Sequence, residues 1–278
     1  MEQRYEILRI LAEALYDHQD VRISSLNRVR NLIRRKLLEL GFEPETKKKD
    51  DDESEPKWTD EELEKMMVDA QKKKLLSDAD YNFLSDSFEL AKNETDIEKQ
   101  YENYLKPLID EEQIWKEWLI YVNGISTRNT CRLLKYFGYC ERFDTVSKLW
   151  AYSGLKVEEG HAVKRKKGDI LGYNLKIKTG VLGVIGECLI KSNKSYKKRI
   201  YDPYKNRILE RGCCENPKCK GKTGHAANMA RRKMVKIFLS HYWMQCRKIK
   251  GLPIRNPYPH KDDDEYIQPF YDKKPDDV

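Results

Sequence analysis

The chain has 278 residues, with 54 Lys and Arg against 46 Asp and Glu, so its formal net charge at pH 7 is +8. Charged residues make up 36% of the sequence and hydrophobic residues 39%, which allows a core beneath an extensively solvated surface. No run of about 18 apolar residues is present to span a bilayer, and the N-terminus lacks the order of a signal peptide. We therefore expect a cytoplasmic protein with no membrane partner.

The first part of the chain predicts helices. Apolar residues recur at helical spacing across residues 1–44, where we expect N-terminal helices that end at Gly41 and Pro44. Residues 45–57 contain no apolar side chain except one proline, which is typical of a charged flexible linker. A helical arm is expected over residues 58–118.

Local capping signals support the helices of this arm. Thr59 and Glu62 have the spacing of a capping box, in which each side chain accepts a hydrogen bond from the other residue's backbone. Ser77 is placed to cap the next helix. A later helical stretch is expected to break at Pro107, because proline removes a backbone donor.

The composition changes after residue 118, where glycines become frequent and apolar segments become shorter. We place a second helical domain at residues 119–260 and an acidic tail at residues 261–278. Since sustained apolar/polar alternation is absent, the whole chain is predicted to be mainly α. Dimerisation through the N-terminal helices is left open, because strict heptads are not sustained.

A short turn at the start of the second domain resembles the hairpin of a helix-hairpin-helix DNA-binding motif. The usual hairpin is Gly–apolar–Gly; here Gly124 and Ile125 match, and Ser126 replaces the second glycine. Glycine permits the positive φ of a tight turn, and serine can cap the following helix, predicted from Thr127 to Phe137. Arg128 and Arg132 lie one turn apart on that helix, so we expect both at a DNA phosphate. An ordinary corner in the core is the alternative.

The second domain resembles the C-terminal domain of the bridge-RNA-guided insertion-sequence transposases (serine recombinases), and more closely the transposase-like proteins of archaea and phages. The resemblance rests on six pieces in the same order, which are "NGIS", "RFDTVSKLWAYSGL", "GHAVKRKKG", "NLKIKTGVLGVIGECLIKSNKSYKKRIYDPYK", "GHAANMARRKMVKIFLSHYW" and "GLPIRNPY".

The resemblance implies two catalytic elements that this sequence lacks. Residues 1–118 show no strands carrying the acidic tetrad of the family's RuvC-like nuclease domain. The segment from Lys156 to Gly168, where the family carries a serine nucleophile, contains no serine. A catalytic role is therefore disfavoured, although we leave it open.

Clusters of cations in the second domain predict contacts to phosphates, each of which would contribute to a salt-dependent affinity. A solvated helix face is the alternative for any one run. Together with the hairpin, the predicted DNA-binding residues are Gly124, Ile125, Ser126, Arg128, Arg132, Lys164, Arg165, Lys166, Lys167, Lys176, Lys178, Lys197, Lys198, Arg231, Arg232 and Lys233. Arg231 to Lys233 are expected to open a helix.

The segment "RGCCENPKCKGKTGH" contains the strongest metal-binding pattern. Its candidate ligands for structural Zn²⁺ are Cys213, Cys214, Cys219 and His225. The usual Cys-x2-Cys spacing is absent, so a vicinal disulfide and free thiols remain alternatives, and His225 could cap a helix or contact phosphate without a metal. The other cysteines, Cys131, Cys140, Cys188 and Cys246, are expected to be free thiols in a core.

We therefore expect a nonenzymatic, nucleoid-associated protein that binds the DNA backbone with little sequence dependence and, by analogy with the family, favours bent or branched DNA. One alternative is an active recombinase or nuclease component, with Ser192, Ser195 or Tyr196 as candidate nucleophiles. The others are an RNA-binding protein and a scaffold assembled through the N-terminal helices.

Overall fold

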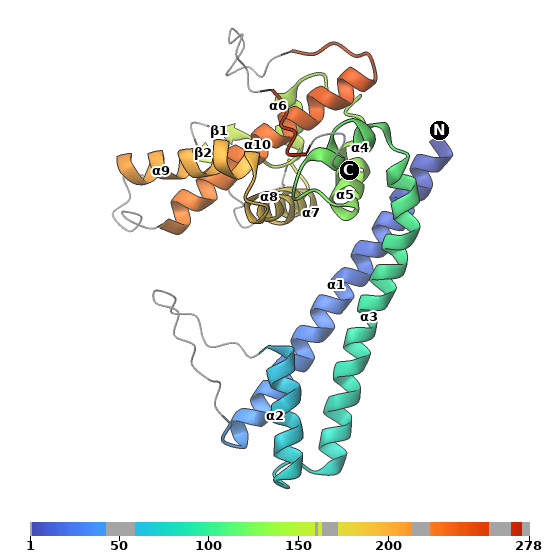
Figure 1. The fold of residues 1–278 in the computed structure, drawn as a ribbon, viewed down its shortest axis with the longest axis vertical. Coiled ribbons are helices and arrows are strands. Elements are labelled where there is room, and N and C mark those ends of the chain that lie inside the picture. Colours follow the sequence, from blue (N-terminus) through green and yellow to red (C-terminus); the bar gives the residue numbers. More distant parts are fainter. Residues whose placement is uncertain are drawn as a thin grey trace. The chain divides into compact units, whose positions relative to one another are not determined.

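The structure is a computed structural model that describes residues 2–42, 59–158, 161–162, 172–212, 223–255 and 268–273 (Figure 1). It is mainly helical, which confirms the predicted fold class. The chain divides into two compact units: unit 1 comprises residues 1–9 and 105–278, and unit 2 comprises residues 10–104. None of the described helices has both the length and the apolar character needed to cross a membrane.

Unit 2 is built from α1 (Glu2–Glu39), α2 (Asp60–Lys72) and α3 (Asp78–Asp110), of which the ends of α1 and α3 belong to unit 1. In Figure 1, α2 runs beside the lower part of α1, and α3 returns along both. The apolar stripes of the three helices meet in a largely aliphatic core. This core contains Leu26, Ile33, Leu37, Leu63, Met67, Ala70, Leu76, Leu84, Phe88 and Ala91.

The N-terminal region forms one helix rather than the two that the sequence predicted. Helix α1 runs unbroken over 38 residues. No glycine or proline interrupts residues 2–40, so nothing in the backbone favours a break. The predicted end is confirmed, because Gly41 follows the helix with a φ of +79°.

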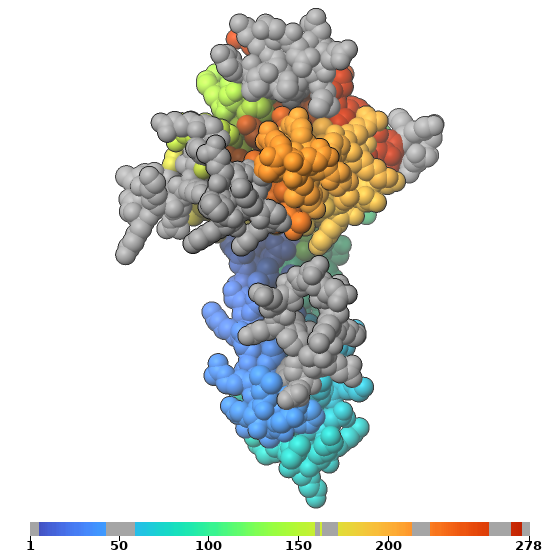
Figure 2. Space-filling model, turned by 90° about the vertical axis from the view of Figure 1, so that its left-hand side faces the viewer, coloured from blue at the N-terminus to red at the C-terminus, as the bar shows by residue number. Residues whose placement is uncertain are grey.

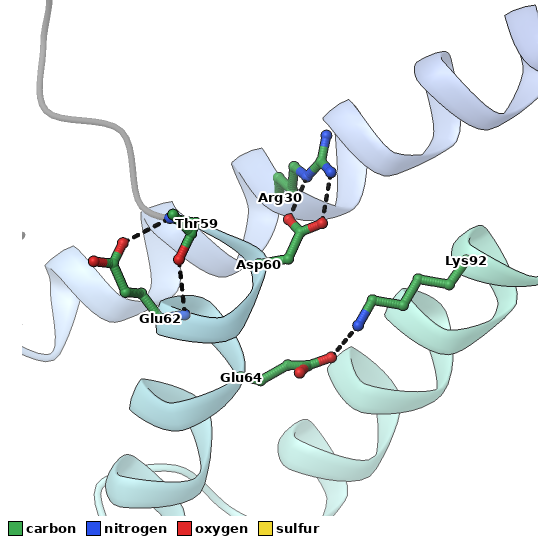
Figure 3. Close-up of polar contacts among 6 residues, drawn as sticks. All are labelled: Arg30, Thr59, Asp60, Glu62, Glu64 and Lys92. Carbon is green, nitrogen blue, oxygen red and sulfur yellow. Dashed lines mark hydrogen bonds and ion pairs between the residues drawn. The ribbon is translucent and has the colours of Figure 1, made fainter. Parts of the chain in front are cut away.

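Both predicted caps in unit 2 are present. The Thr59 N–H donates to Glu62 Oε2 at 2.7 Å, and the Glu62 N–H donates to Thr59 Oγ1 at 3.2 Å, which completes the capping box at the start of α2 (Figure 3). Ser77 Oγ accepts the N–H of Asp80 at 3.1 Å at the start of α3.

The predicted break at Pro107 is wrong, because α3 continues through this proline to Asp110. Leu105 and Ile109, on either side of it, are both fully buried. Their packing holds the helical path although Pro107 cannot donate a backbone hydrogen bond. The proline removes only one backbone hydrogen bond, the one that its own N–H would have donated to the preceding turn.

Unit 1 contains short helices arranged around one long helix. In chain order its elements after α3 are α4 (Gln113–Glu117), η1 (Leu119–Tyr121), α5 (Thr127–Phe137), α6 (Val146–Tyr152), β1 (Val157–Glu158), β2 (His161–Ala162), α7 (Leu175–Lys178), η2 (Thr179–Ile185), α8 (Gly186–Lys191), η3 (Lys197–Tyr201), α9 (Asp202–Arg211) and α10 (Thr223–Ile249). Strands β1 and β2 form a two-residue antiparallel pair.

Helix α10 is the centre of unit 1 and contacts α4, α6, α8, α9, η2 and η3. Its second half is buried nearly all round, as expected of a helix in the middle of a core. Aromatic side chains fill this core and also satisfy their polar atoms: Trp243 Nε1 donates to the Phe143 carbonyl at 2.7 Å, and the Tyr242 hydroxyl donates to the Gly138 carbonyl at 2.7 Å.

The division into units differs from the predicted boundary near residue 118. Residues 105–118 belong to unit 1, because Ile109, Ile114 and Trp118 are buried in its core and the Trp118 ring stacks on Phe238 with a centroid distance of 5.6 Å. Part of the predicted acidic tail, residues 268–273, also packs in unit 1, where Phe270 is buried.

Candidate nucleic-acid interface

The hairpin at residue 124 adopts the predicted backbone. Gly124 has a φ of +92°, and Ser126 Oγ accepts the Asn129 N–H at 3.5 Å at the start of α5. Helix α5 covers the predicted range, Thr127–Phe137. However, a Cβ at Gly124 would lie 2.6 Å from the Cys188 carbonyl oxygen. The glycine therefore lets the hairpin pack closely against the backbone of α8.

One of the hairpin's backbone donors is occupied by the chain's own C-terminal segment. The Asn123 N–H donates to Asp272 Oδ2 at 3.1 Å. Ile125 is buried in the unit 1 core, as the alternative of an ordinary core corner expects. The hairpin of the described structure therefore has an internal packing role, and it does not by itself present an open phosphate site.

The predicted pairing of Arg128 with Arg132 at a phosphate is wrong for Arg132. That side chain is 8% exposed, and its Nη1 donates to the Gly180 carbonyl at 3.4 Å. A Cβ at Gly180 would lie 2.9 Å from Arg132 Cδ, so the glycine makes room for the arginine stem. Arg128 is only half-buried, one turn nearer the start of α5.

A concentration of positive charge among the described residues lies on α10. Lys236 follows Arg232 by four residues and Lys233 by three, so its side chain lies beside both of them on the helix surface. We call these three residues the α10 cation cluster. All three are half-buried, and within the described ranges none forms an ion pair with an acidic side chain.

Neighbouring elements hold these cations in place through neutral groups. Lys236 Nζ lies 4.0 Å from the ring centroid of Trp150 on α6, and Trp150 Nε1 donates to the Lys236 carbonyl at 3.0 Å. Arg232 Nη2 donates to the Lys156 carbonyl at 2.9 Å. An aromatic face and a carbonyl orient the cations but leave their charge uncompensated.

The pKa values of the cluster show the electrostatic cost of this arrangement. Burial, reinforced by the charges of Arg232 and Lys233, lowers the pKa of Lys236 to about 8. Burial also lowers the pKa of Arg232, and burial together with Arg207 lowers the pKa of Lys233. A bound anion would stabilise the protonated forms and reverse these shifts.

Two further cations extend the cluster. Lys178 Nζ donates to the Tyr173 hydroxyl at 3.2 Å, and Tyr173 acts to raise the pKa of Arg232, against the larger effect of burial. A Cβ at Gly154, whose φ is +68°, would lie 2.6 Å from the Tyr173 ring, so only glycine admits this tyrosine. On the other side, Arg207 is exposed on α9, whose surface faces the viewer in Figure 2 (orange).

The other predicted DNA-binding cations are distributed differently. Arg231 pairs with Glu187 on α8, and Lys197 pairs with Asp202 at 2.7 Å, so their charges are compensated within the chain. Lys176 on α7 and Lys198 on η3 are exposed. Residues 164–167 lie outside the described residues.

Arg231, Arg232 and Lys233 do not open a helix as predicted. Helix α10 begins eight residues earlier at Thr223. Ala226, Ala227 and Ala230 are strong helix formers and extend the helix toward its N-terminus. The macrodipole of the first turn therefore does not act on these cations.

Most of the predicted zinc ligands, which are Cys213, Cys214 and Cys219, lie outside the described residues. The fourth, His225, is exposed in the first turn of α10. Within the described ranges, no group of three or more His, Cys, Asp or Glu side chains is arranged to hold a metal ion. The remaining cysteines are free, with Cys131, Cys140 and Cys246 buried as expected and Cys188 half-exposed.

The three alternative nucleophiles lie in different surroundings. Tyr196 is buried, and its hydroxyl lies 2.8 Å from Nδ1 of the buried His241. The Ser192 hydroxyl donates to the Leu189 carbonyl at 2.8 Å. The Ser195 N–H donates to Asp272, and Ser195 is itself half-buried.

Sequence reasoning missed Lys236, Trp150, Tyr173 and Arg207. Lys236 stands alone in the apolar run "MVKIF", so it does not form a visible charge run. Its spacing of three and four residues from Lys233 and Arg232 would have placed it on the same helix face. No such local signal connects Trp150 or Tyr173 to α10, because they lie on other elements.

Comparison with protein-family models, with curated proteins and with solved structures finds no match to this chain.

Proposed function

We propose that this protein binds DNA through its phosphate backbone, without catalysis, using the α10 cation cluster as the centre of the contact. The observation that carries the proposal is that Arg232, Lys233 and Lys236 are close together, partly desolvated and uncompensated by acids in the described part of the chain. Such an arrangement is destabilising in isolation and becomes favourable when a polyanion neutralises it.

The side chains of the cluster favour backbone contact over base readout. Arginine and lysine bind phosphate oxygens through charge and hydrogen bonds that carry no sequence information, and we expect the cluster to act in this way. The resemblance to transposase C-terminal domains favours DNA over other polyanions, and bent or branched DNA over linear duplex. It also suggests a nucleoid-associated location and an origin in a mobile element, and structural zinc at Cys213, Cys214, Cys219 and His225 stays part of the proposal.

The test is a triple variant, Arg232→Gln with Lys233→Gln and Lys236→Gln, compared with the wild type by fluorescence anisotropy on a duplex and a four-way junction over a salt series. Losing three phosphate contacts should weaken binding on the order of 100-fold near physiological salt and flatten the salt slope by about 3. Retained affinity with an unchanged slope would refute the proposed interface.

A matched control removes the same charge from unit 2. Lys72, Lys73 and Lys74 form an exposed run of three cations at the end of α2. Replacing all three by Gln gives the same change in net charge, yet it should leave affinity and salt slope nearly unaltered. Competition with structured RNA in the same assay separates DNA binding from RNA binding.

A second candidate function, self-assembly through unit 2, is favoured by one observation. Phe83, Leu90 and Tyr104 on α3 are 63%, 68% and 60% exposed and follow at intervals of seven and fourteen residues, with the half-buried Ile97 between the last two. Residues seven apart share a helix face, so these side chains form an uncovered apolar row.

Sedimentation velocity over a concentration series tests this assembly. Leu90→Lys, in the middle of the row, should shift the protein toward the monomer. Leu75→Lys replaces another exposed leucine outside the row, and it should leave association unchanged. A wild type that stays monomeric at every concentration would exclude assembly through this row.

A further inference from the structure

Residues 268–273 form a short segment that is docked on unit 1. The Phe270 carbonyl accepts a hydrogen bond from Trp118 Nε1 at 3.0 Å. The Asp272 N–H donates to the Tyr121 carbonyl at 2.8 Å, and the Tyr271 hydroxyl accepts from Gln245 Nε2 at 3.1 Å. The segment therefore contacts Trp118 at the end of α4, Tyr121 in the 3₁₀ turn η1 and Gln245 in α10.

An aromatic anchor holds this segment in register. Phe270 is 7% exposed, and its ring centroid lies 4.9 Å from that of Tyr196 and 5.3 Å from that of His241. The guanidinium carbon of Arg199 lies 5.2 Å from the Phe270 centroid. This anchor places the side chain of Asp272, two residues later, at a fixed point between two elements.

The carboxylate of Asp272 is held by backbone donors from two distant parts of the chain. Oδ2 accepts the Asn123 N–H at 3.1 Å, and Oδ1 accepts the Ser195 N–H at 3.0 Å. Ser195 begins the helical run that continues through η3 and α9, so its N–H lies at the positive end of a helix. The two donors converge on one anion.

The carboxylate is held by backbone donors without a compensating cation in the described part of the chain. Within the described residues, Asp272 forms hydrogen bonds with these backbone groups but no ion pair with a Lys or Arg. Lys194, Lys198 and Arg199 are exposed along the same segment as Ser195. An anion that replaced the carboxylate would therefore meet two N–H donors and nearby positive charge.

We propose that the N–H groups of Asn123 and Ser195 form an anion site that Asp272 occupies in the free protein and that a phosphate of bound DNA takes over in the complex. The segment 268–273 is then an intramolecular competitor of DNA, and it limits affinity until a phosphate displaces it. This inference rests on the proposed DNA-binding function and adds a second contact outside the α10 cation cluster.

The test is Asp272→Ala in the full chain, assayed for DNA affinity over a salt series. The variant should bind DNA about fivefold more tightly near physiological salt, and its salt slope should steepen by about 0.9, which corresponds to one additional phosphate contact. Glu89→Gln, at an exposed acid on α3 in unit 2, makes the same change in net charge and should leave the slope unchanged.

A second measurement covers the case in which Asp272→Ala weakens the fold. Inorganic phosphate should raise the melting temperature of Asp272→Ala more than that of the wild type, because only in the variant are the Asn123 and Ser195 N–H groups free to bind it. An unchanged or reduced DNA affinity, or a melting temperature that responds to phosphate equally in both proteins, would overturn the proposed site.

The two proposals fail in different ways. If wild-type protein shows no DNA binding, the proposed function fails, and phosphate stabilisation of Asp272→Ala still reports on the anion site. If the α10 cluster variant loses affinity as expected while Asp272→Ala gains none, the function stands and the anion site is refuted.

Discussion

Unit 2 and unit 1 contain similar runs of charged residues but use them differently. In unit 2, acids from a neighbouring helix compensate three of the cations: Arg22 pairs with Glu98, Lys92 pairs with Glu64, and Arg30 makes two hydrogen bonds of 2.7 Å to Asp60 (Figure 3). In the described part of unit 1, no ion pair involves the α10 cation cluster, whose neighbours are an aromatic ring and a carbonyl.

This difference shows that a charge run does not reveal its own role. The pKa values show the difference between paired and unpaired cations. The hydrogen bond with Asp60 raises the pKa of Arg30, whereas burial lowers the pKa of Lys236. A cation whose pKa is raised already has its partner in the fold. A cation whose pKa is lowered would have its charged form stabilised by an anion from outside the protein.

The largest expected effect concerns the cores. Trp243 is fully buried in unit 1 and donates a hydrogen bond to Phe143, so Trp243→Ala should lower the free energy of unfolding by about 4 kcal/mol. In the aliphatic core of unit 2, Leu63→Ala should cost about 3 kcal/mol. Chemical denaturation followed by circular dichroism measures both. Equal, small losses below about 1 kcal/mol would contradict the packing of both units.

A pH dependence of DNA binding would sharpen the contrast in charge. Because the pKa of Lys236 is about 8, this side chain loses its proton as pH rises through that value. A bound phosphate raises the pKa again, so binding takes up a proton and affinity falls as pH rises. From about pH 7 to about pH 9, we expect a loss of about fivefold, equivalent to one phosphate contact.

The control for this pH dependence is Lys236→Arg. A guanidinium stays protonated across this range, so the variant should bind DNA with a flatter pH profile. Anisotropy titrations at constant ionic strength distinguish the two profiles. A wild type whose affinity is independent of pH would remove Lys236 from the interface.

Loss of a helix cap in unit 2 should have a moderate effect. Thr59→Ala removes the acceptor for the Glu62 N–H and should destabilise unit 2 by about 1 kcal/mol. Thr59→Ser retains the hydroxyl and should be nearly neutral. Thermal unfolding compares the two variants, and an equal loss in both would show that the cap bond does not contribute.

The smallest expected effect belongs to the ion pairs of unit 2. A double-mutant cycle on Arg30→Gln and Asp60→Asn should give a coupling of about 0.5 kcal/mol at neutral pH, since both side chains are partly solvated. Arg30 lowers the pKa of Asp60, so this stability is present above the unfolded-state pKa and is lost as pH falls through the lowered folded-state pKa. A coupling energy that persists in strong acid, where Asp60 is protonated, would show that the ion pair is not its source.

Several local features could be predicted from the sequence because their causes lie within one or two helical turns. The Thr59–Glu62 capping box, the Ser77 cap and the limits of α5 from Thr127 to Phe137 all depend on neighbouring residues. The errors at Pro107 and in α1 have different causes. At Pro107, packing on both sides of the proline outweighed a breaker residue, whereas in α1 no glycine or proline marks the break that was expected.

The candidate site was predictable only in part. Arg232 and Lys233 were found as a charge run, but Lys236 was hidden in an apolar segment, and Arg132 was assigned to DNA although its charge faces the Gly180 carbonyl. Charge type is visible in a sequence. Whether that charge is buried, paired or left for a partner depends on residues far along the chain.

By itself, the sequence determined the helical class, the two caps of unit 2 and some helix ends, because backbone preference and apolar periodicity act locally. Only the tertiary structure decided that Arg231 is compensated by Glu187 while Arg232 is not, and that the Asn123 N–H meets a carboxylate 149 residues away. The physical reason is that hydrogen bonding and desolvation depend on distances in space, which folding sets independently of separation along the chain.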